Sequence, residues 1–89
     1  MVRLFVRHAV ENYATWRAGY DSTPALRAQY GVTGDAVYQS VDDPNDVTVW
    51  HDFETVEAAQ AFLGATELKQ AMADFGVTGT PQIWIANEA

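Results

Sequence analysis

Two segments of the chain alternate apolar and polar positions with the two-residue period of a β-strand. They cover residues 2–8 and 47–53. Each is followed by a stretch with helical spacing, and each of those stretches leads into a shorter strand-like segment, at residues 36–41 and 82–86. The pattern therefore predicts the order strand, helix, strand twice along the chain.

A short sequence repeat ends both helical stretches. The run Tyr30-Gly31-Val32-Thr33-Gly34 returns 45 positions later as Phe75-Gly76-Val77-Thr78-Gly79. Glycine tolerates the left-handed conformation that ends many helices, and the next apolar residue can pack back on the last turn. A chance likeness of two helix ends is the alternative. We favour a duplicated unit, because the flanking strands repeat at the same offset.

The helical stretches carry start and stop signals. The first opens around Glu11-Asn12, and Thr55 is a plausible cap for the second. Pro24 interrupts the first stretch, and Thr23 is expected to cap a second piece that runs to Tyr30. A similar break is expected in the second stretch at residues 64–66.

The turn-rich residues 42–46 join the two middle strands and predict a hairpin. With right-handed crossovers, this order predicts a ferredoxin-like α+β fold, in which the helices cover one face of a four-stranded antiparallel sheet. The length of 89 residues fits a single domain over residues 1–89.

Large apolar residues occur on both sides of the predicted strands. Trp50 lies opposite the row of His51, Trp84 lies opposite Ile83, and Phe5 points away from the apolar row of its strand. Helices can cover only one sheet face, so we expect the other face to be buried against a second copy, giving a homodimer. Scattered exposed apolar residues are the alternative.

Composition removes several function classes. Five basic against twelve acidic residues give a net charge of −7, which disfavours nucleic acid and anionic membranes as partners. No segment has the apolar length of a membrane helix, and we expect a cytoplasmic protein. Cysteine is absent, and Asp42, Asp43 and Asp46 lack calcium-loop spacing. We therefore expect no metal and no cofactor.

Several of these segments together resemble the dimeric α+β barrel superfamily. They are Val6-Arg7-His8 with residues 12–16, the Gly31-Val32-Thr33-Gly34 motif, residues 42–47 and residues 62–72. The superfamily includes small bacterial antibiotic-biosynthesis-monooxygenase-like proteins and aromatic polyketide cyclases. The similarity spans nearly the whole chain, and it rests on turns, caps and packing positions.

The resemblance implies a homodimer with a ligand cavity between helices and sheet in each subunit. It also implies a choice of activities, including cofactor-free oxygenation of polyketide quinone precursors, cyclisation, haem degradation and lactone isomerisation. The cofactor-free oxygenases use an Asn, Trp, Tyr and Arg set, which Asn12, Trp16, Tyr20 and Arg17 match in type. Haem degraders use a helical histidine, whereas both histidines here belong to strands.

Candidate catalytic residues are His51, His8 and Arg17. An imidazole titrates near neutrality, so either histidine can act as a general base. Each can instead be a structural histidine of the core. Arg17 can hold a carboxylate or enolate, or form a solvated ion pair.

Aromatic side chains are the candidate ligand-binding residues. On the first helix they fall on one face, where they can stack on a flat ligand or simply fill the core. Aromatic residues of the strands are further candidates whose position the pattern leaves open. The full set is Tyr13, Trp16, Tyr20, Tyr38, Trp50 and Trp84.

Two classes of function follow. The first is a small-molecule-binding barrel, acting as a cofactor-independent monooxygenase or cyclase on an aromatic or polyketide-like metabolite. The second is a non-catalytic binding or assembly module with a vestigial cavity. An enclosed pocket of a few hundred Å³ favours an enzyme or binder, and a filled interior favours an assembly module.

Overall fold

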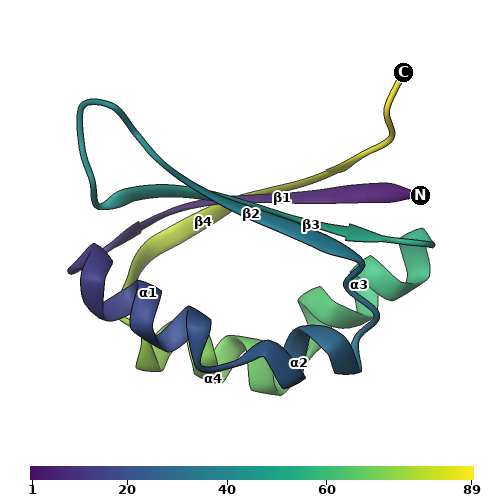
Figure 1. The fold of residues 1–89 in the computed structure, drawn as a ribbon, viewed down its shortest axis with the longest axis horizontal. Coiled ribbons are helices and arrows are strands. Elements are labelled where there is room, and N and C mark those ends of the chain that lie inside the picture. Colours follow the sequence, from purple (N-terminus) through teal and green to yellow (C-terminus); the bar gives the residue numbers. More distant parts are fainter.

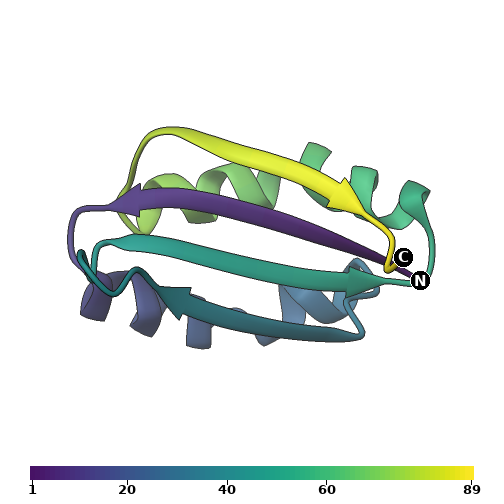
Figure 2. The same cartoon turned by 90° about the horizontal axis from the view of Figure 1, so that it is seen from above.

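The computed structural model describes residues 1–89 and has a helical layer on one face of a sheet. The four strands form an antiparallel sheet in the order β2-β3-β1-β4, which confirms the ferredoxin-like α+β prediction. Figures 1 and 2 show all helices on the same side of this sheet. None of the helices is long and apolar enough to cross a membrane. The elements are β1 (Val2–Val10), α1 (Tyr13–Asp21), α2 (Pro24–Gln29), β2 (Gly34–Gln39), β3 (Asp46–Phe53), α3 (Val56–Gly64), α4 (Thr66–Asp74) and β4 (Val77–Ala86).

The predicted cap at Thr55 is confirmed, and Asn12, near the predicted start of the first helix, is also a cap. The Asn12 side-chain oxygen accepts from the backbone N–H of Thr15 at 3.0 Å, and the Thr55 hydroxyl accepts from that of Ala58 at 3.1 Å. Thr23 occupies the predicted cap position before α2, but the predicted side-chain capping bond is absent. Its hydroxyl makes no capping bond to α2 and instead donates to the Tyr20 carbonyl at 3.0 Å, because the last carbonyls of α1 lack helical partners.

Both repeat motifs end a helix as predicted, with positive φ at Gly31 (79°) and Gly76 (81°). The strands that follow differ from their predicted bounds. β2 begins and ends two residues early, since the hairpin turn begins at Ser40, whose N–H donates to the Asp46 carbonyl at 2.9 Å. β4 already begins at Val77, because its start pairs with the end of β1. Gly79 (φ 67°) then lies where the pairing with β1 shifts register.

The main core lies between the sheet and the helices. Alternate residues of β1 and β3 face the helices, and the rows include His8 and His51. Leu4, Val47 and Phe53 have no exposed surface. Trp16 and Tyr20 from α1, with Ala59 and Phe62 from α3, close over these rows. Both histidines are therefore held inside the helix–sheet layer.

The opposite sheet surface, which we call the open face, carries a row of aromatic rings. Phe5 on β1 lies between Trp50 on β3 and Trp84 on β4 in the strand register. The Phe5 and Trp84 rings stack with centroids 5.3 Å apart, and the Arg3 guanidinium lies 3.6 Å above the Trp50 ring. No helix of the chain covers this face (Figure 1), and Trp84 remains 45% exposed.

Candidate functional site

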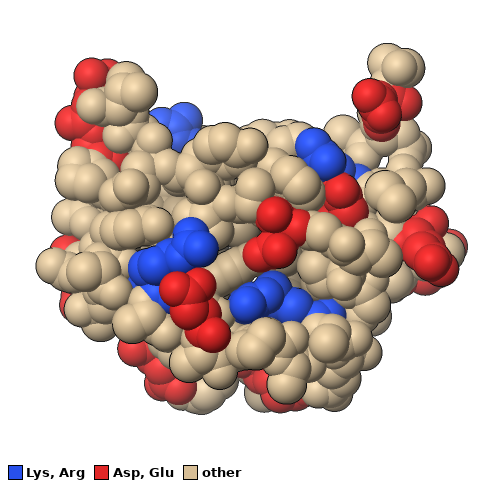
Figure 3. Space-filling view, viewed as in Figure 1, with Lys and Arg blue, Asp and Glu red and all other residues tan.

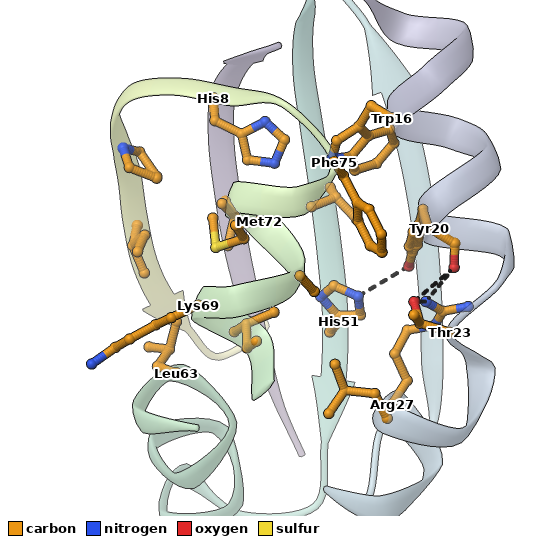
Figure 4. A pocket seen from close by; sticks show the side chains of 17 residues that line it. His8, Trp16, Tyr20, Thr23, Arg27, His51, Leu63, Lys69, Met72 and Phe75 are labelled. Carbon is orange, nitrogen blue, oxygen red and sulfur yellow. Dashed lines mark hydrogen bonds between the residues drawn. The ribbon is translucent and has the colours of Figure 1, made fainter. Parts of the chain in front are cut away.

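A cavity of about 290 Å³ lies between the sheet and the helical layer. Its lining is mostly apolar and comes from every helix and from three strands, β1, β3 and β4. In Figure 4, Tyr20 and His51 face each other, and Met72 of α4 and Phe75, which follows α4, also border the cavity. Its lining includes His8, Trp16, Tyr20, Arg27, His51 and Phe75.

His51 is the polar centre of this cavity. It lies on β3, is only 6% exposed, and its Nε2 is 3.0 Å from the Tyr20 hydroxyl. Burial lowers the pKa of His51 to about 4, and the nearby Arg27 charge acts in the same direction. Asp35 and Asp52 oppose this effect only in part. The imidazole is therefore neutral at physiological pH.

Tyr20 links His51 to a carboxylate at the sheet edge. Its hydroxyl donates to Asp35 Oδ2 at 2.5 Å. Asp35 on β2 is the direct cross-strand neighbour of His51, so both side chains emerge on the helix side of the sheet. Burial, together with the bond to Asp35, raises the pKa of the Tyr20 phenol, which stays protonated.

Arg27 packs on the other side of Tyr20. Its guanidinium lies 4.0 Å from the Tyr20 ring centroid, and one of its nitrogens donates to the Tyr20 carbonyl at 2.9 Å. Three of the chain's five basic side chains form ion pairs with aspartates, Arg3 with Asp52, Arg7 with Asp46 and Arg17 with Asp21. The two without an ion pair, Arg27 and Lys69, both line the cavity. On the face shown in Figure 3, basic and acidic atoms lie next to each other.

His8 occupies the far end of the same cavity. It lies opposite Val47 in the β1–β3 register, whereas His51 lies opposite Leu4. At about 3.3 Å per residue this separates the two histidines by about 13 Å along the sheet. Trp16 packs edge-on against His8, and burial lowers the pKa of His8. At this separation the two imidazoles cannot share a proton or a metal ion.

The structure brings four of the predicted residues together at the cavity, His8, Trp16, Tyr20 and His51. Tyr13 packs against Trp16 without lining the cavity. Arg17 bonds Asp21 outside it, and Asn12 serves as a helix cap. The strand aromatic residues Tyr38, Trp50 and Trp84 do not line the cavity.

The sequence did not single out several polar residues of the site, including Arg27 and Asp35. Arg27 takes the place expected for Arg17, one helix further along the chain. Asp35 lies just outside the strand predicted over residues 36–41, so the pattern does not point to it. A signal for Asp35 existed, since a hairpin with its tip near Asp43 places Asp35 opposite His51.

Comparison with known proteins shows which structures share this fold. By sequence, the chain matches no family model and no curated protein. By structure, it resembles a provisionally named antibiotic biosynthesis monooxygenase from Bordetella bronchiseptica, with 19% identity, 99% and 96% coverage of the two chains, and a TM-score of 0.85.

SnoaB, a cofactor-independent oxygenase from Streptomyces nogalater, has 15% identity, 99% and 94% coverage, and a TM-score of 0.75. A second provisionally named antibiotic biosynthesis monooxygenase, from Deinococcus radiodurans, has 17% identity, 100% and 93% coverage, and a TM-score of 0.75. The chain therefore has the ferredoxin-like α+β fold of the antibiotic-biosynthesis-monooxygenase-like proteins, as the sequence resemblance implied.

Proposed function

We propose that this chain binds a small, flat aromatic metabolite in the cavity and removes a proton from it, as a cofactor-independent monooxygenase or a cyclase. The observation that carries this proposal is a buried, uncharged imidazole, His51, in a cavity with aromatic walls. Both reactions begin with the loss of a proton from an acidic C–H or O–H group. The fold shared with SnoaB supports the same proposal.

Each lining group has a role in this proposal. Trp16 and Tyr20 are stacked on each other with ring centroids 5.1 Å apart and give the cavity an aromatic wall against which the ligand packs. Arg27, which has no ion-pair partner, binds an oxygen of the ligand. The volume of about 290 Å³ is near the lower end of the range for small-molecule sites, so the ligand is compact.

The test uses a dihydroxyanthrone as the probe, because it is a flat aromatic compound that loses a proton readily and can then react with O₂. Oxygen uptake and the absorbance of the probe report turnover, and quenching of tryptophan fluorescence reports binding. We expect His51→Ala to abolish turnover while binding remains. Asp42→Ala, an exposed substitution in the β2–β3 hairpin, is the control. Unchanged turnover in His51→Ala rejects the proposed role of His51.

A non-catalytic binding protein is the second candidate. The low pKa of His51 favours it, because a weak base removes protons poorly. Under this alternative, the wild-type protein binds the probe without consuming oxygen or changing the probe. A pure assembly module has less support, because such a module is expected to have a filled interior, whereas this chain has a cavity of about 290 Å³.

We also propose a homodimer in which the open faces of two copies pack together. The aromatic row of Phe5, Trp50 and Trp84 has no cover within the chain. A twofold arrangement brings identical apolar rows together, and burying aromatic rings at about 25 cal/mol per Å² stabilises such a pair.

A further inference from the structure

Three polar side chains connect the solvent with the interior of the cavity. Asp35 is exposed at the sheet edge, whereas Tyr20 and His51 are each 6% exposed. The Tyr20 hydroxyl is 2.5 Å from Asp35 Oδ2 and 3.0 Å from His51 Nε2. Figure 4 shows His51 turned with one ring nitrogen toward Tyr20. The three groups thus form one continuous hydrogen-bonded chain.

The number of available protons determines which group donates in each of the two hydrogen bonds. A carboxylate can only accept, so Tyr20 gives its single hydroxyl proton to Asp35. The Tyr20 oxygen must then accept from His51, which places the imidazole proton on Nε2. The other nitrogen, Nδ1, keeps a free lone pair, and it is buried without a hydrogen-bond partner. The structure therefore presents an acceptor on the side of the ring away from Tyr20.

We propose that Asp35 and Tyr20 form a proton relay for His51. In the proposed step the ligand's X–H bond breaks and its proton binds His51 Nδ1, while the ligand keeps the electron pair. The Nε2–H bond breaks as its proton moves to the Tyr20 oxygen, and the Tyr20 proton moves to Asp35, which releases it to water. This inference rests on the proposed function of His51 as a base.

The relay removes an energetic obstacle to that function. Without it, His51 must carry a positive charge inside an apolar cavity, and burial disfavours that form. With it, the imidazole is neutral before and after the step. Both hydrogen bonds also survive with their direction reversed, since Tyr20 then donates to Nε2 and accepts from Asp35. The charged groups that act on His51 are Asp35 on β2, Arg27 on α2 and Asp52 on β3, the last from the open face, where it bonds Arg3.

The direct test is the tautomer of His51, measured by ¹⁵N NMR on the ligand-free protein at neutral pH. We expect the proton on Nε2 in the wild-type protein. Asp35→Ala frees the Tyr20 proton for His51, so we expect the population of that tautomer to fall, and Tyr20→Phe to cause a similar loss. Asp42→Ala is the matched control and is expected to match the wild type.

Two outcomes overturn the relay. The first is a wild-type His51 that carries its proton on Nδ1, and the second is an unchanged tautomer in Asp35→Ala. Because Asp35 is exposed, this variant is expected to fold, and its amide spectrum verifies that. The tautomer is read without ligand, so its result is independent of the proposed catalysis. With the dihydroxyanthrone probe, Asp35→Ala is expected to reduce turnover by about tenfold or more at unchanged affinity.

Discussion

At the scale of single residues, the site depends on how burial changes the chemistry of ordinary side chains. His51 and Tyr20 are each buried, so each is held in its uncharged form. Asp35, a direct partner of Tyr20, is exposed and supplies the negative charge. The site thus combines an uncharged imidazole and an uncharged phenol in the interior with a carboxylate at its edge.

Acid is expected to unfold this protein partly through His51. Its pKa of about 4 in the folded protein is below the ordinary value of 6.5. Between these two values, His51 binds a proton in the unfolded chain but not in the folded one. Above about pH 6.5, His51 does not lower the free energy of unfolding. As the pH falls from about 6.5 toward about 4, this free energy decreases by up to about 3 kcal/mol. Urea unfolding at a series of pH values measures this.

The control for the acid experiment is His51→Gln, in which that part of the pH dependence disappears. The lowered pKa of His8 acts in the same direction and remains in the variant. Asp46 and Asp52, whose pKa values are lowered by Arg7 and Arg3, add further losses only at lower pH. An equal slope in the variant and the wild type between about pH 6.5 and 4 contradicts the role of His51.

At the scale of elements, a close contact between α1 and the residue that follows α4 shapes the cavity. A Cβ built at Gly19 would lie 2.3 Å from the Phe75 ring, so only glycine allows the ring to lie there. Phe75 also lines the cavity. The position of α1 and the wall of the cavity are therefore coupled through this contact.

Gly19→Ala is expected to displace Phe75. Overpacking of this kind costs about 1–3 kcal/mol, which exceeds the gain of about 1 kcal/mol in helix propensity. We expect a lower free energy of unfolding and weaker binding of the aromatic probe. Gly64→Ala in α3 is the control, because nothing lies within 4 Å of its added Cβ. Equal stability and binding in Gly19→Ala and the wild type would show that the contact does not matter.

The cap at the start of α1 gives a second prediction at this scale. Asn12→Ala removes the acceptor for the Thr15 N–H and is expected to lower the free energy of unfolding by about 1 kcal/mol. Asn12→Ser retains a capping oxygen and is expected to restore most of the loss. Thermal and urea unfolding of the three proteins compare these effects.

At the scale of the whole molecule, the sheet has one face covered by helices and one face bare. The covered face contains the cavity, and the open face carries the aromatic row. An exposed apolar surface of this kind is a common site of association between proteins. Dimerisation through this face would leave the cavity within each subunit.

Sedimentation equilibrium measures the proposed dimer directly. We expect the wild-type protein to have about twice the chain mass of 9.8 kDa. Trp84→Glu places a charge in the aromatic row and is expected to give a monomer. Gln60→Ala, an exposed substitution in α3 on the helical side of the molecule (Figure 1), should leave the mass unchanged. A monomeric wild-type protein in dilute buffer would remove the basis for the dimer.

Much of the fold could be predicted from local patterns in this chain. Strand alternation over residues 2–8 and 47–53, helix ends at Gly31 and Gly76, a helix start near Asn12 and a cap at Thr55 all appear in the structure. Each of these signals acts within a few residues. The errors concern the strand limits at residues 36–41 and 82–86 and the cap at Thr23, where neighbouring elements supplied the hydrogen-bond partners.

The order of the elements and the residues that share a sheet face could be predicted from the residues alone, because both follow from the periodicity of the backbone. Only the tertiary structure decided that the face with His8 and His51 receives the helices, leaving Trp50 and Trp84 on the other side. It also joined Asp35, Tyr20 and His51 into one chain of hydrogen bonds. The physical reason is that such contacts depend on strand register and helix position, which local periodicity does not specify.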